Sequence, residues 1–124
     1  MSAIFYSKEH AWVRLASDGV ATVGISDFAQ DQLGELVFVE LPQLGALVTA
    51  SEPAASFESN KAMDDLIAPV SGEVVEVNHE LDQDPEIVND DPIGAGWVFK
   101  VRLSNETELQ NLLASDSYIE YIEG

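Results

Sequence analysis

With 124 residues and a hydrophobic content of 46%, the chain is long enough for one modest core, and we expect residues 1–124 to form a single domain. Its 23 acidic and five basic residues give a formal net charge of −18, which favours a monomer and excludes nucleic acids and anionic membranes as partners. The absence of cysteine excludes a thiol nucleophile, a disulfide and a thiolate metal site, so sulfur redox chemistry must arrive on a cofactor.

The N-terminal residues 1–9 contain neither a long apolar run nor an Arg-rich amphipathic stretch, so no secretory signal or transit peptide is visible. No segment reaches the roughly 20 apolar residues that a membrane-spanning helix needs. We therefore expect a bacterial cytoplasmic protein, with the mitochondrial matrix as the alternative if a presequence has been removed.

Short runs typical of β-strands recur along the chain and are separated by Gly, Pro, Asn and Asp turn signals. The runs lie at residues 11–15, 20–25, 36–41, 54–58, 73–78 and 97–103. The segments at 34–39 and 72–77 also share the pattern Gly-Glu-apolar-Val-x-Val, which either reflects strand composition alone or indicates two similar β-units that face each other. This pattern predicts an all-β sandwich or barrel.

The first of two segments that favour a helix lies near residues 27–33. Asp27 is a candidate N-cap, and Gln30 follows three residues later. Gly34 is placed to end the helix after Leu33, because glycine readily adopts the conformation that follows a helix C-terminus.

The second segment that favours a helix lies near residues 105–115, close to the C-terminus. Ser104 or Asn105 can serve as its N-cap. Its apolar residues recur at helical spacing and form one face that can pack on the sheets; they are Leu109, Leu112 and Leu113. We interpret this leucine stripe as core rather than as a site.

One of only three lysines, Lys61, lies in a polar segment between two apolar strands. Its neighbours are mostly acidic or small and polar: Glu58, Ser59, Asn60, Asp64 and Asp65. The ordinary interpretation is a solvated turn residue that lowers local repulsion between carboxylates. The other interpretation is a lysine that is presented for covalent modification.

The residues around Lys61 favour the second interpretation through a resemblance to a known family. Glu-Ser-Asn-Lys-Ala at residues 58–62, followed by Ala-Pro-Val-Ser-Gly-Glu-Val-Val-Glu-Val-Asn at residues 68–78, resembles the lipoylation hairpin of glycine cleavage H proteins. Further family segments match in order and spacing at residues 24–30, 33–42 and 88–97. Biotin-carrying and other lipoyl-carrying domains share the lysine hairpin but lack the Phe-Val-Glu-Leu-Pro and Gly-Trp segments found here.

The resemblance implies a mostly β hybrid barrel-sandwich of two facing antiparallel sheets, with Lys61 at a hairpin tip and a helix at the C-terminus. It also implies that lipoate is joined to Lys61 by an amide bond, which removes the lysine charge and adds a long flexible arm. A lipoylating enzyme would recognise the hairpin through the residues that flank the lysine, which are Glu58, Ser59, Asn60 and Ala62. The family often has Val where this chain has Asn60, a change within the recognised tip.

By the same resemblance, the protein is a non-catalytic carrier rather than an enzyme. Its arm would take the aminomethyl group of glycine from a pyridoxal-phosphate glycine decarboxylase to a folate-dependent aminomethyltransferase. Dihydrolipoamide dehydrogenase would then reoxidise the arm. Tethering replaces a search through bulk solution with a high local concentration of the intermediate at each partner.

The resemblance also suggests an acidic pocket on the carrier that holds the amine of the loaded arm. This chain departs from the family at one position of that pocket. The family commonly reads His-Glu-Trp where this chain has His-Ala-Trp, so Ala11 supplies no carboxylate. Asp65, four residues after Lys61, is the first candidate for the arm pocket. Glu9 is a substitute candidate, although strand geometry would direct its side chain elsewhere.

Three hypotheses for function remain open from the sequence. They are the glycine cleavage carrier, a lipoyl relay protein that supplies lipoate to other enzymes, and a small acidic binding module whose Lys61 stays unmodified. A metal site is not expected, because the two histidines, His10 and His79, lie far apart in sequence and no thiolate ligand is available.

Overall fold

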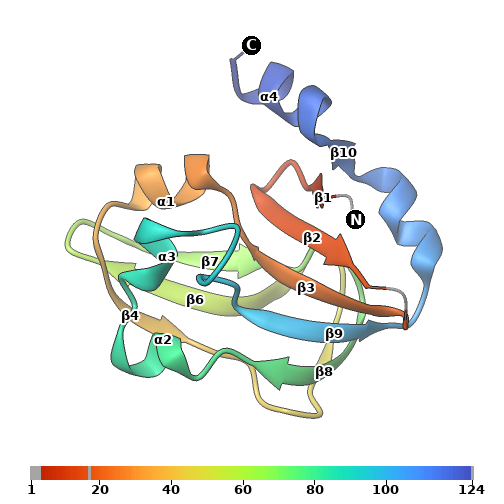
Figure 1. The fold of residues 1–124 in the computed structure, drawn as a ribbon, viewed down its shortest axis with the longest axis horizontal. Coiled ribbons are helices and arrows are strands. Elements are labelled where there is room, and N and C mark those ends of the chain that lie inside the picture. Colours follow the sequence, from red (N-terminus) through yellow and green to blue (C-terminus); the bar gives the residue numbers. More distant parts are fainter. Residues whose placement is uncertain (1–3, 17, 124) are drawn as a thin grey trace.

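Two antiparallel β-sheets form the framework of the protein, seen in Figure 1, in a computed structural model that describes residues 4–16 and 18–123. The seven-stranded sheet has the order β10-β1-β2-β3-β9-β8-β5. Its strands are β1 (Ile4–Tyr6), β2 (Ala11–Leu15), β3 (Val20–Ile25), β5 (Leu47–Val48), β8 (Gly72–Val77), β9 (Phe99–Leu103) and β10 (Leu113–Ala114). The three-stranded sheet has the order β4-β6-β7, with β4 (Leu36–Glu40), β6 (Pro53–Ser59) and β7 (Met63–Ile67).

One cluster of buried apolar side chains joins the two sheets. Val13, Val23 and Val101 come from the larger sheet, and Val39 and Phe57 come from the smaller one; all five are at most 1% exposed. Alternate residues of a strand point to opposite faces, so each of these strands contributes every second side chain to the core. The smaller sheet, which carries Lys61 at one end, is therefore fixed by core packing.

The prediction of a mostly β fold with two antiparallel sheets is confirmed, although the sheets do not close into a barrel. Six of the strands lie where the sequence predicted them, within two residues at each end. The four strands that the sequence did not indicate are short or polar: β1, β5, β7 and β10. The two segments with the shared Gly-Glu pattern form β4 and β8, which belong to different sheets.

The short helix α1 (Asp27–Leu33) lies at the predicted residues. Its N-cap is Ser26 rather than Asp27, because the Ser26 Oγ accepts the Ala29 N–H at 3.1 Å. Asp27 instead lies in the first turn, where the positive end of the helix dipole stabilises its carboxylate. Gly34, with φ 85°, ends the helix as predicted.

The helix predicted near residues 105–115 is present in part and begins at the predicted N-cap Asn105, but it is a 3₁₀ helix rather than an α-helix and ends at Asn111. The chain forms a 3₁₀ helix, η1 (Glu106–Asn111), then β10, and only then α4 (Ser115–Glu123). Leu109 and Leu112 still pack against the core. Leu113 pairs with Tyr6 of β1 instead, because the open edge of β1 offers backbone hydrogen bonds that a helix would leave unused.

Two single-turn helices, α2 (Glu80–Gln83) and α3 (Ile87–Asp90), follow β8. Each places one apolar side chain in the core, Leu81 and Val88 respectively. In the part of the chain that the structure describes, no helix has the length and apolar character needed to cross a membrane.

Candidate functional site

Lys61 lies at the tip of the hairpin between β6 and β7, and the loop around it is very short. The backbone closes at Ser59, whose N–H donates to the carbonyl of Ala62 at 2.8 Å. The Ser59 hydroxyl accepts the N–H groups of Lys61 and Ala62 at 3.2 and 3.0 Å. One nearly buried serine therefore fixes the backbone on both sides of the lysine.

The conformation of this loop explains why the serine is needed. Hairpin loops of two or three residues usually contain at least one residue with positive φ, so that the turn matches the twist of the strands. Among described residues other than glycine, positive φ occurs at His10 and Ser51, and neither lies in the loop. In this loop the Ser59 hydroxyl accepts two backbone N–H groups, a local side-chain-to-backbone pattern that is typical of serine in turns.

The side chain of Lys61 is exposed and lies over the end of α1. A Cβ added at Gly34 would be 2.7 Å from the Lys61 Cε and 3.3 Å from its Nζ, so the end of the lysine side chain lies against the backbone of Gly34. Asn60 ties the tip to the same place, because its N–H donates to the Glu35 carbonyl at 3.2 Å and its Nδ2 donates to the Glu35 Oε1 at 3.3 Å. Valine, which the family often has here, could not make the side-chain bond.

Asn89, which the sequence did not mark as functional, supports the segment beneath Lys61. Its Nδ2 donates to the Gly34 carbonyl and to the Gln30 Oε1, both at 2.9 Å. Its Oδ1 accepts the Leu36 N–H at 2.9 Å. The only sequence signal was that Asn89 falls within one of the segments that match the family.

A groove of about 390 Å³ lies beside the hairpin tip. Its apolar wall includes Phe28 and Leu33 of α1 and Phe57 of β6. Its titratable lining residues are Glu9, His10, Asp64 and Asp65. Among the residues that the sequence singled out, Glu9, Ala62 and Asp65 line this groove, whereas Glu58, Ser59, Asn60 and Lys61 lie outside its lining.

Strand register separates the two adjacent aspartates of β7. Asp64 pairs with Phe57, which is 1% exposed, and directly opposed residues share a face of the sheet. Asp64 therefore belongs to the face that meets α1 and the core. Asp65 pairs with Ser56 on the opposite face and borders the groove from the sheet edge. The sequence alone could not distinguish the two, because the register was unknown.

His10 forms part of the groove wall and adopts an unusual backbone conformation, with φ 72°. Its Nδ1 lies 2.7 Å from the Tyr118 hydroxyl, and its ring contacts Phe28 at a centroid distance of 4.9 Å. Burial lowers the pKa of His10, and the charges of Glu9 and Asp64 act in the opposite direction. In the described residues, no three His, Asp or Glu side chains are grouped as metal ligands.

Replacing Ser59 by alanine is expected to lower the free energy of unfolding by about 1–2 kcal/mol, because two backbone N–H groups lose their acceptor. Urea denaturation measures this change. Ser56→Ala is the matched control, since Ser56 lies on the same strand and donates one bond to the exposed Glu40 carboxylate. An equal loss of stability in both variants would show that the Ser59 hydroxyl has no special part in the turn.

Comparison with known proteins finds one family along nearly the whole chain. Residues 4–124 match the family described as Glycine cleavage H-protein. A glycine cleavage system H protein of Marinobacter nauticus is 49% identical over 121 residues, which cover 98% of this chain and 93% of that protein. One from Escherichia coli is 52% identical over 113 residues, or 91% and 88% of the two chains.

A solved structure resembles the fold over almost its whole length. The crystal structure of a glycine cleavage system H protein from Mycobacterium marinum has a TM-score of 0.90, at 38% sequence identity and with 98% of each chain covered. The chain therefore belongs to the glycine cleavage H-protein family.

Proposed function

We propose that this protein is the lipoyl carrier of a glycine cleavage system, with lipoate attached to the Nζ of Lys61. The observation that carries this proposal is the exposed Lys61 at the tip of a short hairpin loop whose backbone is held by Ser59. When attached, lipoate supplies a cyclic disulfide, which is the sulfur chemistry that this cysteine-free chain lacks. The chain itself catalyses no step.

The hairpin residues present the lysine to a lipoylating enzyme. Ser59 and Ala62 fix the loop backbone, Asn60 ties it to Glu35, and Glu58 is exposed on β6 just before the loop. A rigid display of one amine allows an enzyme to find it through the local fold rather than through a long sequence. Lys61 fits this role because its side chain is exposed, so that an enzyme can reach its amine.

The groove beside the tip has the chemistry expected for a long apolar arm with a cationic cargo. Phe28, Leu33 and Phe57 offer an apolar wall. Carboxylates at the rim stabilise a protonated amine, and a protonated amine has no free lone pair with which to expel its neighbouring sulfur. Of the groove carboxylates, Asp64 and Asp65 follow directly after the hairpin loop on β7, and Glu9 comes from the loop after β1.

Asp64 fills the role that the family assigns to glutamate at position 11. Ala11 is 1% exposed and pairs with Ile25 in the larger sheet, so it contributes no charge to the groove. Asp64 lies on the groove side of β7 and contributes to the electrostatic environment of His10. We infer that Asp64 and Asp65 together hold the cargo amine, and that Glu9 assists.

The partners would be glycine decarboxylase, aminomethyltransferase, dihydrolipoamide dehydrogenase and a lipoylating enzyme. The net charge of −18 favours encounters with basic surfaces on these proteins and speeds association. The relatives named above come from bacteria, and we place the cycle in a bacterial cytoplasm.

Intact mass measurement of protein from lipoate-replete cells tests the attachment site. The native chain and Lys100→Arg are expected to gain one lipoyl group, and Lys61→Arg is expected to gain none. Lys100 is the matched control, because it lies within β9 rather than at a hairpin tip. Its Nζ is 3.6 Å from the Glu76 carboxylate. A native chain that stays unmodified when a competent lipoylating enzyme is supplied would refute the proposal.

Replacing Asp64 by asparagine is expected to shorten the lifetime of the aminomethyl-loaded carrier about threefold to tenfold, because one carboxylate near the amine is lost. Release of ammonia from the isolated loaded protein measures this lifetime. Asp65→Asn should have a similar or smaller effect. Asp82→Asn, on α2 next to His79, removes the same charge elsewhere and should leave the lifetime unchanged. Equal lifetimes in all four proteins would exclude an acidic arm pocket on β7.

A further inference from the structure

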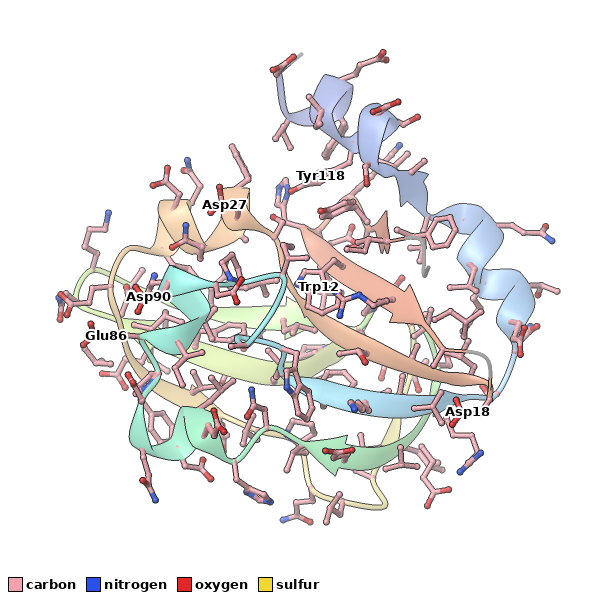
Figure 2. All side chains as sticks on the ribbon, in the orientation of Figure 1. Trp12, Asp18, Asp27, Glu86, Asp90 and Tyr118 are labelled. Carbon is pink, nitrogen blue, oxygen red and sulfur yellow. The ribbon has the colours of Figure 1, made fainter. Side chains whose placement is uncertain are left out.

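The hydroxyl of Tyr118 connects the C-terminal helix to the wall of the groove. Tyr118 is 4% exposed, and its ring stacks on Tyr6 with centroids 4.3 Å apart. Its hydroxyl lies 2.7 Å from the His10 Nδ1 and 2.8 Å from the Ser26 Oγ. Figure 2 shows Tyr118 on the inner side of α4, near the end of α1 that carries Asp27.

The hydrogen atoms of this group can be assigned from what each atom is able to donate. Ser26 Oγ accepts the Ala29 N–H at the start of α1, so its own proton remains available for the Tyr118 oxygen. The Tyr118 proton can then be donated to the His10 Nδ1. In this arrangement both hydroxyl protons have an acceptor, and His10 is neutral with its proton on Nε2.

A charged imidazolium would reverse the chain and leave one group unsatisfied. Its Nδ1–H would donate to Tyr118, and the Tyr118 proton would then be donated to Ser26 Oγ. The Ser26 proton would have no acceptor among the bonds that the described residues make, and Ser26 is 1% exposed. An unpaired buried hydroxyl is costly, so the hydrogen-bond chain favours the neutral ring.

The charge of His10 bears directly on the groove. His10 lines the groove together with Glu9, Asp64 and Asp65. The charges of Glu9 and Asp64 favour protonation of the ring, and its other close neighbours, Tyr118, Tyr121 and Phe28, are aromatic. A protonated His10 would compensate these carboxylates and repel a cationic amine in the groove.

We propose that Tyr118 is a positioning residue, which holds His10 as the neutral tautomer with its proton on Nε2 and so leaves the groove carboxylates available to the amine of the loaded arm. The functional part rests on the carrier function proposed above. The C-terminal helix then has a defined role, because it delivers the hydroxyl that sets the protonation state of a residue in the groove wall.

The tautomer part of this proposal is tested by ¹⁵N NMR of the two histidines in Tyr118→Phe, which keeps the ring stacked on Tyr6 but removes the hydroxyl. The native protein should show His10 with an unprotonated Nδ1 and a protonated Nε2 near neutral pH. In Tyr118→Phe we expect a mixture of tautomers and a His10 pKa that moves upward, because the hydroxyl that favours the neutral ring is lost while Glu9 and Asp64 still favour protonation. His79, exposed on the surface, is the internal reference and should not change.

Tyr121→Phe is the matched control. It lies on the same helix, and its exposed hydroxyl makes only a long bond of 3.4 Å to the Lys8 carbonyl. The native protein keeps the test decisive if Tyr118→Phe does not fold, because a His10 with a protonated Nδ1 near neutral pH would overturn the proposal. Unchanged His10 signals in a folded Tyr118→Phe would also overturn it.

The functional part is tested on the lipoylated, aminomethyl-loaded protein. Loss of the amine as ammonia is expected to be about threefold faster in Tyr118→Phe than in the native protein or in Tyr121→Phe. An unchanged rate would overturn the role of His10 in the groove. The NMR measurement does not need lipoate, so a chain that is never lipoylated would refute the carrier function while the tautomer result stands or falls separately.

Discussion

Replacing Lys61 by arginine is expected to reduce glycine-dependent turnover of a reconstituted cleavage system to the background of a mixture without carrier. Arginine keeps the positive charge and most of the length, but its guanidinium stays protonated and does not form the amide that lysine forms with lipoate. The side chain is exposed, so the fold should be unaffected. Exchange of labelled bicarbonate into glycine measures the turnover.

Two controls separate loss of the arm from loss of the fold. Lys100→Arg should retain full exchange, because Lys100 is held by Glu76 and a cation–π contact with Trp97 rather than displayed at a tip. The urea denaturation midpoints of both variants should match that of the native chain. Exchange well above background with Lys61→Arg would mean that the intermediate is carried elsewhere, and the assignment of Lys61 would be wrong.

Replacing Trp12 by alanine is expected to produce the largest loss of stability, about 3–5 kcal/mol. The ring is 0% exposed, and its Nε1–H donates to the Pro92 carbonyl at 2.9 Å. It also fills the space above Gly24, where a Cβ would lie only 2.7 Å from the ring nitrogen. Since small domains are stable by roughly 5–15 kcal/mol, a large part of the total would be lost.

The measurement is calorimetry or urea denaturation, in which Trp12→Ala should lower Tm by about 10–20 °C. Trp97→Ala is the matched control, because Trp97 is only partly buried and its ring contacts the amine of Lys100. It should cost clearly less than Trp12→Ala. Comparable losses from both substitutions would mean that the burial of Trp12 and its bond to Pro92 do not dominate the stability of this end of the core.

The elements that could be predicted from sequence are those with a strong local signal. The alternating runs gave β2, β3 and β9 because half-buried strands need a period of two. Gly34 marked the end of α1 because the chain leaves the helix with a positive φ that glycine tolerates. The N-cap was displaced by one residue, since Ser26 and Asp27 are both good caps and only the backbone geometry decides between them.

The C-terminal segment shows where local signals were insufficient. Its leucine spacing is compatible with one helix. Instead, Leu113 and Ala114 pair with the edge of β1 as a strand, and the C-terminal α-helix begins only at Ser115. Similarly, β7 has no alternating pattern, and its strand conformation follows from pairing with β6. Backbone hydrogen bonds to a distant strand outweigh weak local preferences.

The sequence by itself determined that Lys61 lies between two strands, which family the chain resembles and where six of the strands lie. These features depend on residue types at fixed short spacings. Only the tertiary structure decided which carboxylates share the groove with His10, how Asn89 supports the lysine and what Tyr118 contacts. The His10 and Tyr118 contact spans 108 residues, and the assignment of Asp64 depends on strand register. Such relations arise from packing and pairing between distant segments, for which the local pattern carries no signal.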